Sequence, residues 1–102
     1  MAEFGIAEDP IRKNGDWYLA GRCVTDIHVG DRFTKFVPIR AEVCPNGERI
    51  YHRGEAVAID LTVVQMTAYR KILEVMSIGM TAGILFRGDG ENLQPFGSLL
   101  TD

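Results

Sequence analysis

The sequence predicts an all-β fold, a small closed β-barrel of six to seven short strands. Apolar and polar residues alternate in short blocks rich in β-branched side chains, which is the pattern of half-buried strands. Glycine, asparagine and proline separate these blocks, as turns between strands do. A chain of 102 residues with 46% hydrophobic and 25% charged residues suits one compact core, so we expect a single domain over residues 1–102. Closure into a barrel removes the exposed edges of a flat sheet.

The N-terminal quarter of the chain predicts two strands joined by a tight turn. The stretch FGIAEDPI predicts a short strand that reaches up to Pro10, and WYLAGRCVT predicts the next strand. Between them stands Asn14-Gly15, the pair favoured in a two-residue hairpin turn, because both central positions of that turn need a positive φ.

A third strand and an insertion follow a second turn. The stretch DIHVGDRFT indicates this turn at Gly30-Asp31, and RFTKFVPI predicts a strand that Pro38 ends. Residues 40–54 hold Pro45-Asn46-Gly47 between two stretches of mixed apolar and polar residues. We therefore expect an inserted hairpin or loop at about residues 38–54.

The long segment at residues 55–75 can be interpreted in two ways. Its front half predicts a strand in which every second residue shares one face, namely Val57, Ile59, Leu61 and Val63. Its back half, YRKILEVM, contains good helix formers, and a helical turn is the alternative. Because no cap precedes that half, we favour a strand that ends in a bend around Ser77-Ile78-Gly79.

The C-terminal part of the chain predicts two more strands. One runs from Thr81 to Arg87, and GSLLTD closes the chain with another. The segment RGDGEN between them lacks the alternating acidic ligands and closing glutamate of a calcium loop, so we interpret it as a glycine-rich turn.

Charge and hydropathy narrow the classes of partner. The formal net charge is -3, and neither end of the chain carries a basic arm, whereas nucleic-acid binders usually show a basic footprint. No apolar run approaches the roughly 20 residues that cross a bilayer, and the first residues lack the pattern of a signal peptide. We therefore expect a soluble, cytoplasmic protein without a membrane partner.

The residues that carry chemistry are few and scattered. Only His28 and His52 are natural bases, and each is expected on the surface. Cys23 and Cys44 form no disulfide framework, and their spacing to the histidines matches no metal motif. Asp60 interrupts an apolar strand and is expected to face solvent. These patterns predict a chain that is not an enzyme and has no metal and no cofactor.

Three blocks, in order, resemble the second domain of the translational GTPases related to elongation factor Tu. They are AGRCVTDIHVGDRF, RKILEVMSIGMTAGILFRG and LQPFGSLLTD. They match a TGRV strand that runs into an I-x-V-G-D/E turn, an F-R-K segment that leads through A-G-x-x-x-G to an L-L-R-G strand, and a closing I-x-x-G-x-V-L strand. The resemblance implies a closed barrel of the translation-factor second-domain type. The sequence lacks a G-x-x-x-x-G-K-[ST] loop, so GTP is not an expected ligand.

The resemblance also points to a binding region. In that family an asparagine helps to hold the aminoacyl end of tRNA, and Thr81 occupies its place, while Gln65 stands where a glutamate is expected. Arg70 alone matches that pocket. It forms a basic and aromatic group with Tyr69 and Lys71, with Arg22 close by if the strands pair as in the family. Such a group can bind a phosphate or an acidic protein surface. The alternative is that these residues are solvated side chains on the barrel rim without a binding role.

Together these patterns favour a non-catalytic binding module that docks on a protein or ribonucleoprotein partner. The docking region would be Tyr69-Arg70-Lys71 together with the insertion at 38–54, because the family's barrel serves as a platform. A tRNA or ribosomal partner fits the resemblance, whereas the net acidity disfavours it. The alternative is a small acidic inhibitor or immunity-type protein that covers a basic site on its partner. The methionines Met66, Met76 and Met80, with Ile78, either fill the core or form an exposed adaptable patch.

Overall fold

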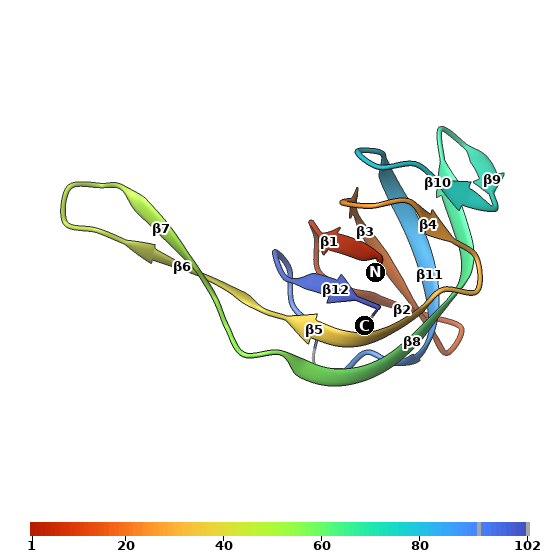
Figure 1. The fold of residues 1–102 in the computed structure, drawn as a ribbon, viewed down its shortest axis with the longest axis horizontal. Coiled ribbons are helices and arrows are strands. Elements are labelled where there is room, and N and C mark those ends of the chain that lie inside the picture. The colour runs from red at the N-terminus through yellow and green to blue at the C-terminus, as the bar shows by residue number, and fades with distance from the viewer. Residues whose placement is uncertain (92, 102) are drawn as a thin grey trace.

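The computed structural model describes residues 1–91 and 93–101. All helices and strands identified in these residues are β-strands, so the fold is all-β (Figure 1). The strands are β1 (Glu3–Ile6), β2 (Ile11–Lys13), β3 (Asp16–Cys23), β4 (Ile27–His28), β5 (Arg32–Val37), β6 (Ile39–Val43), β7 (Arg49–Arg53), β8 (Val57–Ala68), β9 (Lys71–Leu73), β10 (Val75–Met76), β11 (Thr81–Asp89) and β12 (Ser98–Leu100). Six of them form an antiparallel sheet in the order β1-β12-β5-β8-β11-β3, and β1 also pairs with β3, which closes the barrel. The predicted closed barrel is thereby confirmed.

One hydrophobic core fills the barrel. Its side chains come from alternate positions of the strands, because successive side chains on a strand point to opposite faces. The ring of Phe86 packs edge-on against Phe33, with 5.6 Å between centroids and an interplanar angle of 85°. The ring centroid of Phe4 lies 6.1 Å from that of Phe86. These three aromatic rings connect β1, β5 and β11 across the interior.

The methionines belong to this core. Met66 and Met76 are fully buried, and Met80 packs against the cluster from the side. The exposed patch offered as an alternative is therefore wrong for the methionines. Ile78 does lie at the surface, where 68% of it is exposed.

The N-terminal segment contains two short strands where the sequence predicted one. β1 ends at Ile6, and β2 begins only after Pro10, because proline has no N–H with which to extend a ladder. The turn between β2 and β3 has φ of 52° at Asn14 and 85° at Gly15, which confirms the predicted turn geometry. Gly30 also has a positive φ, 95°, at the predicted turn before β5.

The inward face of β8 changes at a bulge. Leu61 and Val63 point into the core as predicted. The ladder with β11 then shifts, so that Val63 and Gln65 pair with neighbouring residues and Val64 is the extra one. Beyond the bulge Met66 faces inward. Of the predicted face, Ile59 is partly buried against the core and Val57 is exposed. The predicted alternation therefore holds from Ile59 to Val63, where the bulge resets the side-chain period.

The chain reverses at Tyr69-Arg70, earlier than the sequence predicted. β9 folds back on β8 with Lys71 opposite Ala68, and β10 then pairs with β4. The preferred bend at residues 77–79 does form a turn, but it follows β10 and does not end β8. Both the uninterrupted strand and the helical alternative are therefore wrong, since neither tyrosine nor arginine marks a turn in a sequence.

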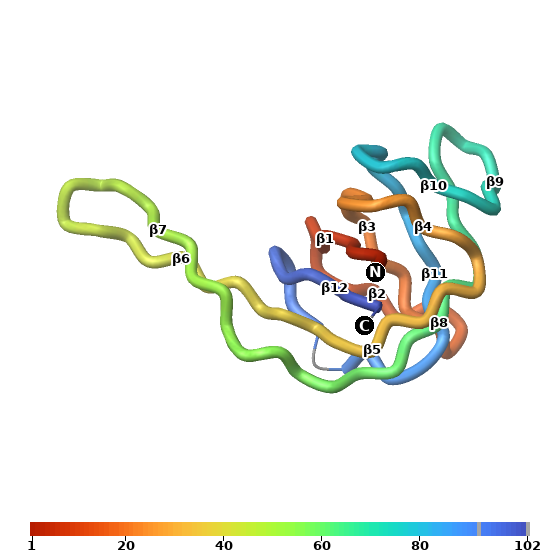
Figure 2. Tube along the Cα trace, in the orientation of Figure 1, coloured from red at the N-terminus to blue at the C-terminus, as the bar shows by residue number. Residues whose placement is uncertain are grey.

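The β6–β7 hairpin projects away from the barrel, as the Cα trace in Figure 2 shows. It lies within the range expected to hold an inserted hairpin or loop. β6 continues from β5 past Pro38, and β7 leads into β8 past Gly54, whose N–H donates to the Pro38 carbonyl at 2.8 Å. The two strands pair only with each other in the described part of the chain. Nearly all of their side chains are exposed.

The C-terminal strands lie close to their predicted positions. β11 extends to Asp89, past the predicted end at Arg87, and β12 occupies the middle of GSLLTD. The predicted glycine-rich turn and the final segment each include one residue, Asn92 and Asp102, that lies outside the described residues.

Candidate functional site

The turn that joins β8 to β9 contains residue types that rarely adopt its backbone geometry. Tyr69 and Arg70 have φ of 53° and 63°, so both central residues of a two-residue hairpin turn are left-handed. Asn14-Gly15 has the same pattern of φ in the β2–β3 turn, with the residues that this geometry favours. An L-residue with a large side chain costs about 1–2 kcal/mol in the left-handed region. The β8–β9 turn therefore stores strain that the β2–β3 turn avoids.

This strained turn presents its side chains to solvent. Tyr69 is 82% exposed and Ile72, on β9, is 72% exposed. Arg70 and Lys71 lie between them in the chain and are exposed as well. We refer to these four residues, 69–72, as the β8–β9 tip. It combines an aromatic ring, an aliphatic side chain and two cations without a covering element in the described residues.

Arg22 and Thr81 lie opposite each other on the neighbouring strands β3 and β11. The ladder between β11 and β8 ends at Gly83 and Thr67, and Thr81 lies two residues beyond that end on β11. Tyr69 lies the same number of residues beyond it on β8. The predicted residues Arg22 and Thr81 are thus at the end of the barrel from which the β8–β9 tip extends.

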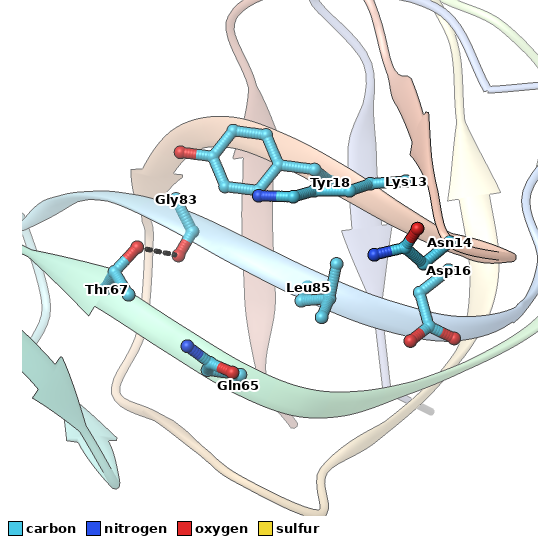
Figure 3. Close-up of a pocket in the computed structure, with 8 residues that line it drawn as sticks. All are labelled: Lys13, Asn14, Asp16, Tyr18, Gln65, Thr67, Gly83 and Leu85. Carbon is cyan, nitrogen blue, oxygen red and sulfur yellow. Dashed lines mark hydrogen bonds between the residues drawn. The ribbon is translucent and has the colours of Figure 1, made fainter.

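Gln65 belongs to a different site. It lies opposite Leu85, on the outer face of the barrel, and lines a hollow of about 320 Å³ that crosses β3, β11 and β8 (Figure 3). Figure 3 shows Tyr18 and Lys13 along one side of this hollow and Gln65 with Thr67 along the other. The remaining lining residues are Asn14, Asp16, Gly83 and Leu85.

The hollow depends on a glycine. The Tyr18 hydroxyl lies over Gly83, in the space that a Cβ atom there would occupy. The hydroxyl of Thr67 donates to the Gly83 carbonyl at 3.3 Å and fixes the neighbouring wall. Sequence reasoning missed this hollow, because its residues come from four strands and the β2–β3 turn, and no motif connects them.

Two arginine–carboxylate pairs lie on the outer face. Arg32 donates to both oxygens of Asp60, at 2.8 and 3.0 Å, and this hydrogen bonding holds the pKa of Asp60 below its usual value. Arg87 donates to Asp16 at 3.2 Å, across β11 and β3. Asp60 is therefore an exposed acid whose partner is a cation on the neighbouring strand, as expected for a solvent-facing strand residue.

The histidines lie at opposite ends of the molecule, in β4 and β7 (Figure 1). The Nδ1 atom of His28 is 3.8 Å from the Asp31 carboxylate, and Nε2 of His52 is 2.9 Å from that of Glu42. Over residues 1–91 and 93–101, no three histidine, cysteine, aspartate or glutamate side chains gather in a group that could hold a metal ion.

The two thiols differ sharply in environment. Cys23 is fully buried, and burial, reinforced by the nearby Asp26 charge, raises the pKa of its thiol. The group therefore stays protonated and unreactive at neutral pH. We expect a thiol reagent to label Cys44 in the native protein and Cys23 only after unfolding. Mass spectrometry of the labelled protein, with and without urea, measures this, and rapid double labelling of native protein would contradict the buried position.

Comparison with models of known protein families gives no match, and comparison with curated proteins gives no relative. The described residues contain no helix that is long and apolar enough to cross a membrane. The strand pairing by itself therefore defines the class, a small closed antiparallel β-barrel with a projecting hairpin.

Proposed function

We propose that the protein is a non-catalytic binding module that docks through the β8–β9 tip on an acidic surface of a partner protein. The observation that carries this proposal is the strained turn at Tyr69-Arg70. Residues held in sparsely populated backbone regions cluster at functional sites, so an observed outlier supports a hypothesis of function. Here the strained turn holds an exposed aromatic ring and an arginine outward.

The composition of the tip favours an acidic surface of a protein as the partner. Tyrosine and arginine are enriched among the residues that dominate binding energies at protein interfaces. Arg70 and Lys71 can form charge-assisted hydrogen bonds with carboxylates of a partner. The exposed Ile72 can pack against an apolar side chain of the same partner. A nucleic acid needs an extended basic footprint for its phosphates, which a chain of net charge -3 does not offer, whereas a small group of carboxylates on a protein can pair with the two cations of the tip alone.

The sequence resemblance to the second domain of the translational GTPases agrees with this proposal. In that family the barrel is a platform, and Arg70-Lys71 matches the family's arginine-lysine pair. Fold alone does not define a function, so the proposal depends on the tip.

The decisive variant replaces the tip by the residues that the turn itself prefers, Tyr69→Asn with Arg70→Gly. Because asparagine and glycine adopt positive φ at low cost, the double variant should be more stable by about 1–2 kcal/mol. The melting temperature should rise, whereas retention of the partner protein should fall at least tenfold. Calorimetry and affinity capture from the native lysate measure the two effects on the same preparations.

Arg12→Ala is the matched control, since Arg12 is an exposed arginine on β2, away from the tip. It should leave retention unchanged. Capture that resists RNase and is competed by poly-glutamate agrees with an acidic protein partner. Capture that RNase abolishes would replace that partner by RNA, and retention that survives the double variant would remove the tip from the site.

A further inference from the structure

The outer edge of β6 is a free strand edge. β6 pairs with β7 on one side, and no strand of the described residues pairs with its other side. The four residues Arg40 to Val43 are exposed, and the hairpin extends the molecule to 45 Å in its longest dimension (Figure 1). An exposed edge of this kind is a template for another strand.

The hydrogen bonds at both ends of the hairpin show which backbone groups point to that edge. The N–H of Gly54 donates to the Pro38 carbonyl, and the N–H of Cys44 donates to the Glu48 carbonyl at 2.7 Å. The backbone groups at positions 38 and 44 therefore point toward the β7 side of the hairpin. Residues of an antiparallel pair alternate between inward and outward bonding. Ile39, Ala41 and Val43 therefore direct their N–H and C=O groups to the free edge.

The sequence of β6, Ile-Arg-Ala-Glu-Val, is complementary to itself in the antiparallel direction. A twofold axis at Ala41 places Ile39 opposite Val43 of a second copy. The same axis places Arg40 opposite Glu42 of that copy, on both sides of the axis. Both apolar and charged positions are thus matched, and the smallest side chain lies at the axis.

We propose that the protein forms a twofold symmetric dimer in which the β6 strands of two copies pair antiparallel through their free edges. The outward-directed groups of Ile39, Ala41 and Val43 form the new backbone hydrogen bonds. Arg40 and Glu42 then occupy non-hydrogen-bonded pairs, where opposing side chains approach most closely. The result is a four-stranded sheet with a barrel at each end.

Arg40 and Glu42 can each form a new ion pair in such a dimer without giving up a contact that they already make. Glu42 binds His52 through Oε2, which leaves its Oε1 atom for a second partner. Arg40 makes no ion pair within the described residues. The edge of β7 does not have this property, because a twofold axis at Tyr51 would place Arg49 opposite Arg53 of the other copy. Pairing through β6 is therefore specific in register and in strand.

The interface is small, so the dimer should be weak. Each strand contributes five residues, a length of about 17 Å at the usual strand rise. Interfaces of this size belong to transient assemblies. Sedimentation velocity of the full chain from about 5 µM to about 1 mM should show a sedimentation coefficient that rises with concentration.

Charge reversal tests the register. Arg40→Glu and Glu42→Arg each turn both attractive pairs into repulsive ones, and each should lower the association constant by about tenfold or more. An equimolar mixture of the two variants pairs glutamates with arginines again, so it should restore association. A mixture that stays monomeric, or single variants that associate like the parent, would overturn this register.

Proline substitutions test which edge is used. Ala41→Pro removes an outward N–H of β6, and Tyr51→Pro removes one from β7, while neither removes a bond between the two strands. Ala41→Pro should abolish association, and Tyr51→Pro should preserve it. Association that survives Ala41→Pro but is lost in Tyr51→Pro would exclude pairing through β6. A parent protein that stays monomeric at all concentrations would exclude it as well.

Discussion

Replacing Gly21 by alanine is expected to destabilise the barrel by about 3 kcal/mol, the upper part of the range for overpacking. A Cβ atom at position 21 would overlap the backbone carbonyl of Gly5 and come within 2.9 Å of the Phe4 ring. The backbone of β1 cannot yield without opening the β1–β3 ladder that closes the barrel. We expect thermal unfolding, followed by circular dichroism, to occur roughly 12–24 °C lower.

Gly5→Ala is the matched control for this prediction. Gly5 lies on the opposing strand, but a Cβ there would meet nothing closer than 3.8 Å. Its melting temperature should remain close to that of the parent protein. Equal losses in the two variants would indicate that glycine matters only for backbone freedom and that β1 and β3 do not approach closely at position 21.

Truncating Phe86 to alanine is expected to lower the free energy of unfolding by about 3–5 kcal/mol. Its side chain is fully buried and contacts the rings of both Phe4 and Phe33. The cavity left by the ring would remove the contacts of β11 with Phe4 on β1 and Phe33 on β5. Urea denaturation should give a midpoint far below that of the parent, or an unfolded protein at 37 °C.

Phe96→Ala provides the comparison, because this ring is 66% exposed. A surface truncation of this kind usually changes stability by less than about 0.5 kcal/mol. If both variants lost similar amounts of stability, the aromatic cluster around Phe86 would not be the centre of the core.

The sequence was sufficient for features that local chemistry determines. Asn14-Gly15 predicts its turn because few other residues tolerate two positive φ values in succession, and Pro38 ends β5 because it has no N–H. Alternation identifies β11 and β12. The closed barrel follows from the number and shortness of such segments.

Features that tertiary contacts determine could not be predicted. The bulge at Val64 has no glycine to mark it, and packing of β8 against β11 sets its position. The turn at Tyr69-Arg70 contradicts local preference, so propensity argued for a continued strand or a helix. The sequence named Tyr69, Arg70 and Lys71 as candidates without revealing that a hairpin carries them.

The placement of Gln65 shows the same limit for the candidate site. The resemblance grouped it with Arg70 and Thr81, yet it lines the hollow beside Tyr18. Only the register of three strands determines which outward residues become neighbours, and one bulge changes that register.

The position of β1 between β3 and β12 has a consequence for the order of folding. The Ala2 N–H donates to the Thr101 hydroxyl at 2.6 Å, across almost the whole length of the chain. Contacts between such distant segments are slow to form, because the chain between them must lose conformational entropy before the contacts stabilise it. We therefore expect β12, the last barrel strand in chain order, to pair last and complete the barrel. Until it docks, the edges of β1 and β5 remain open to any neighbouring chain.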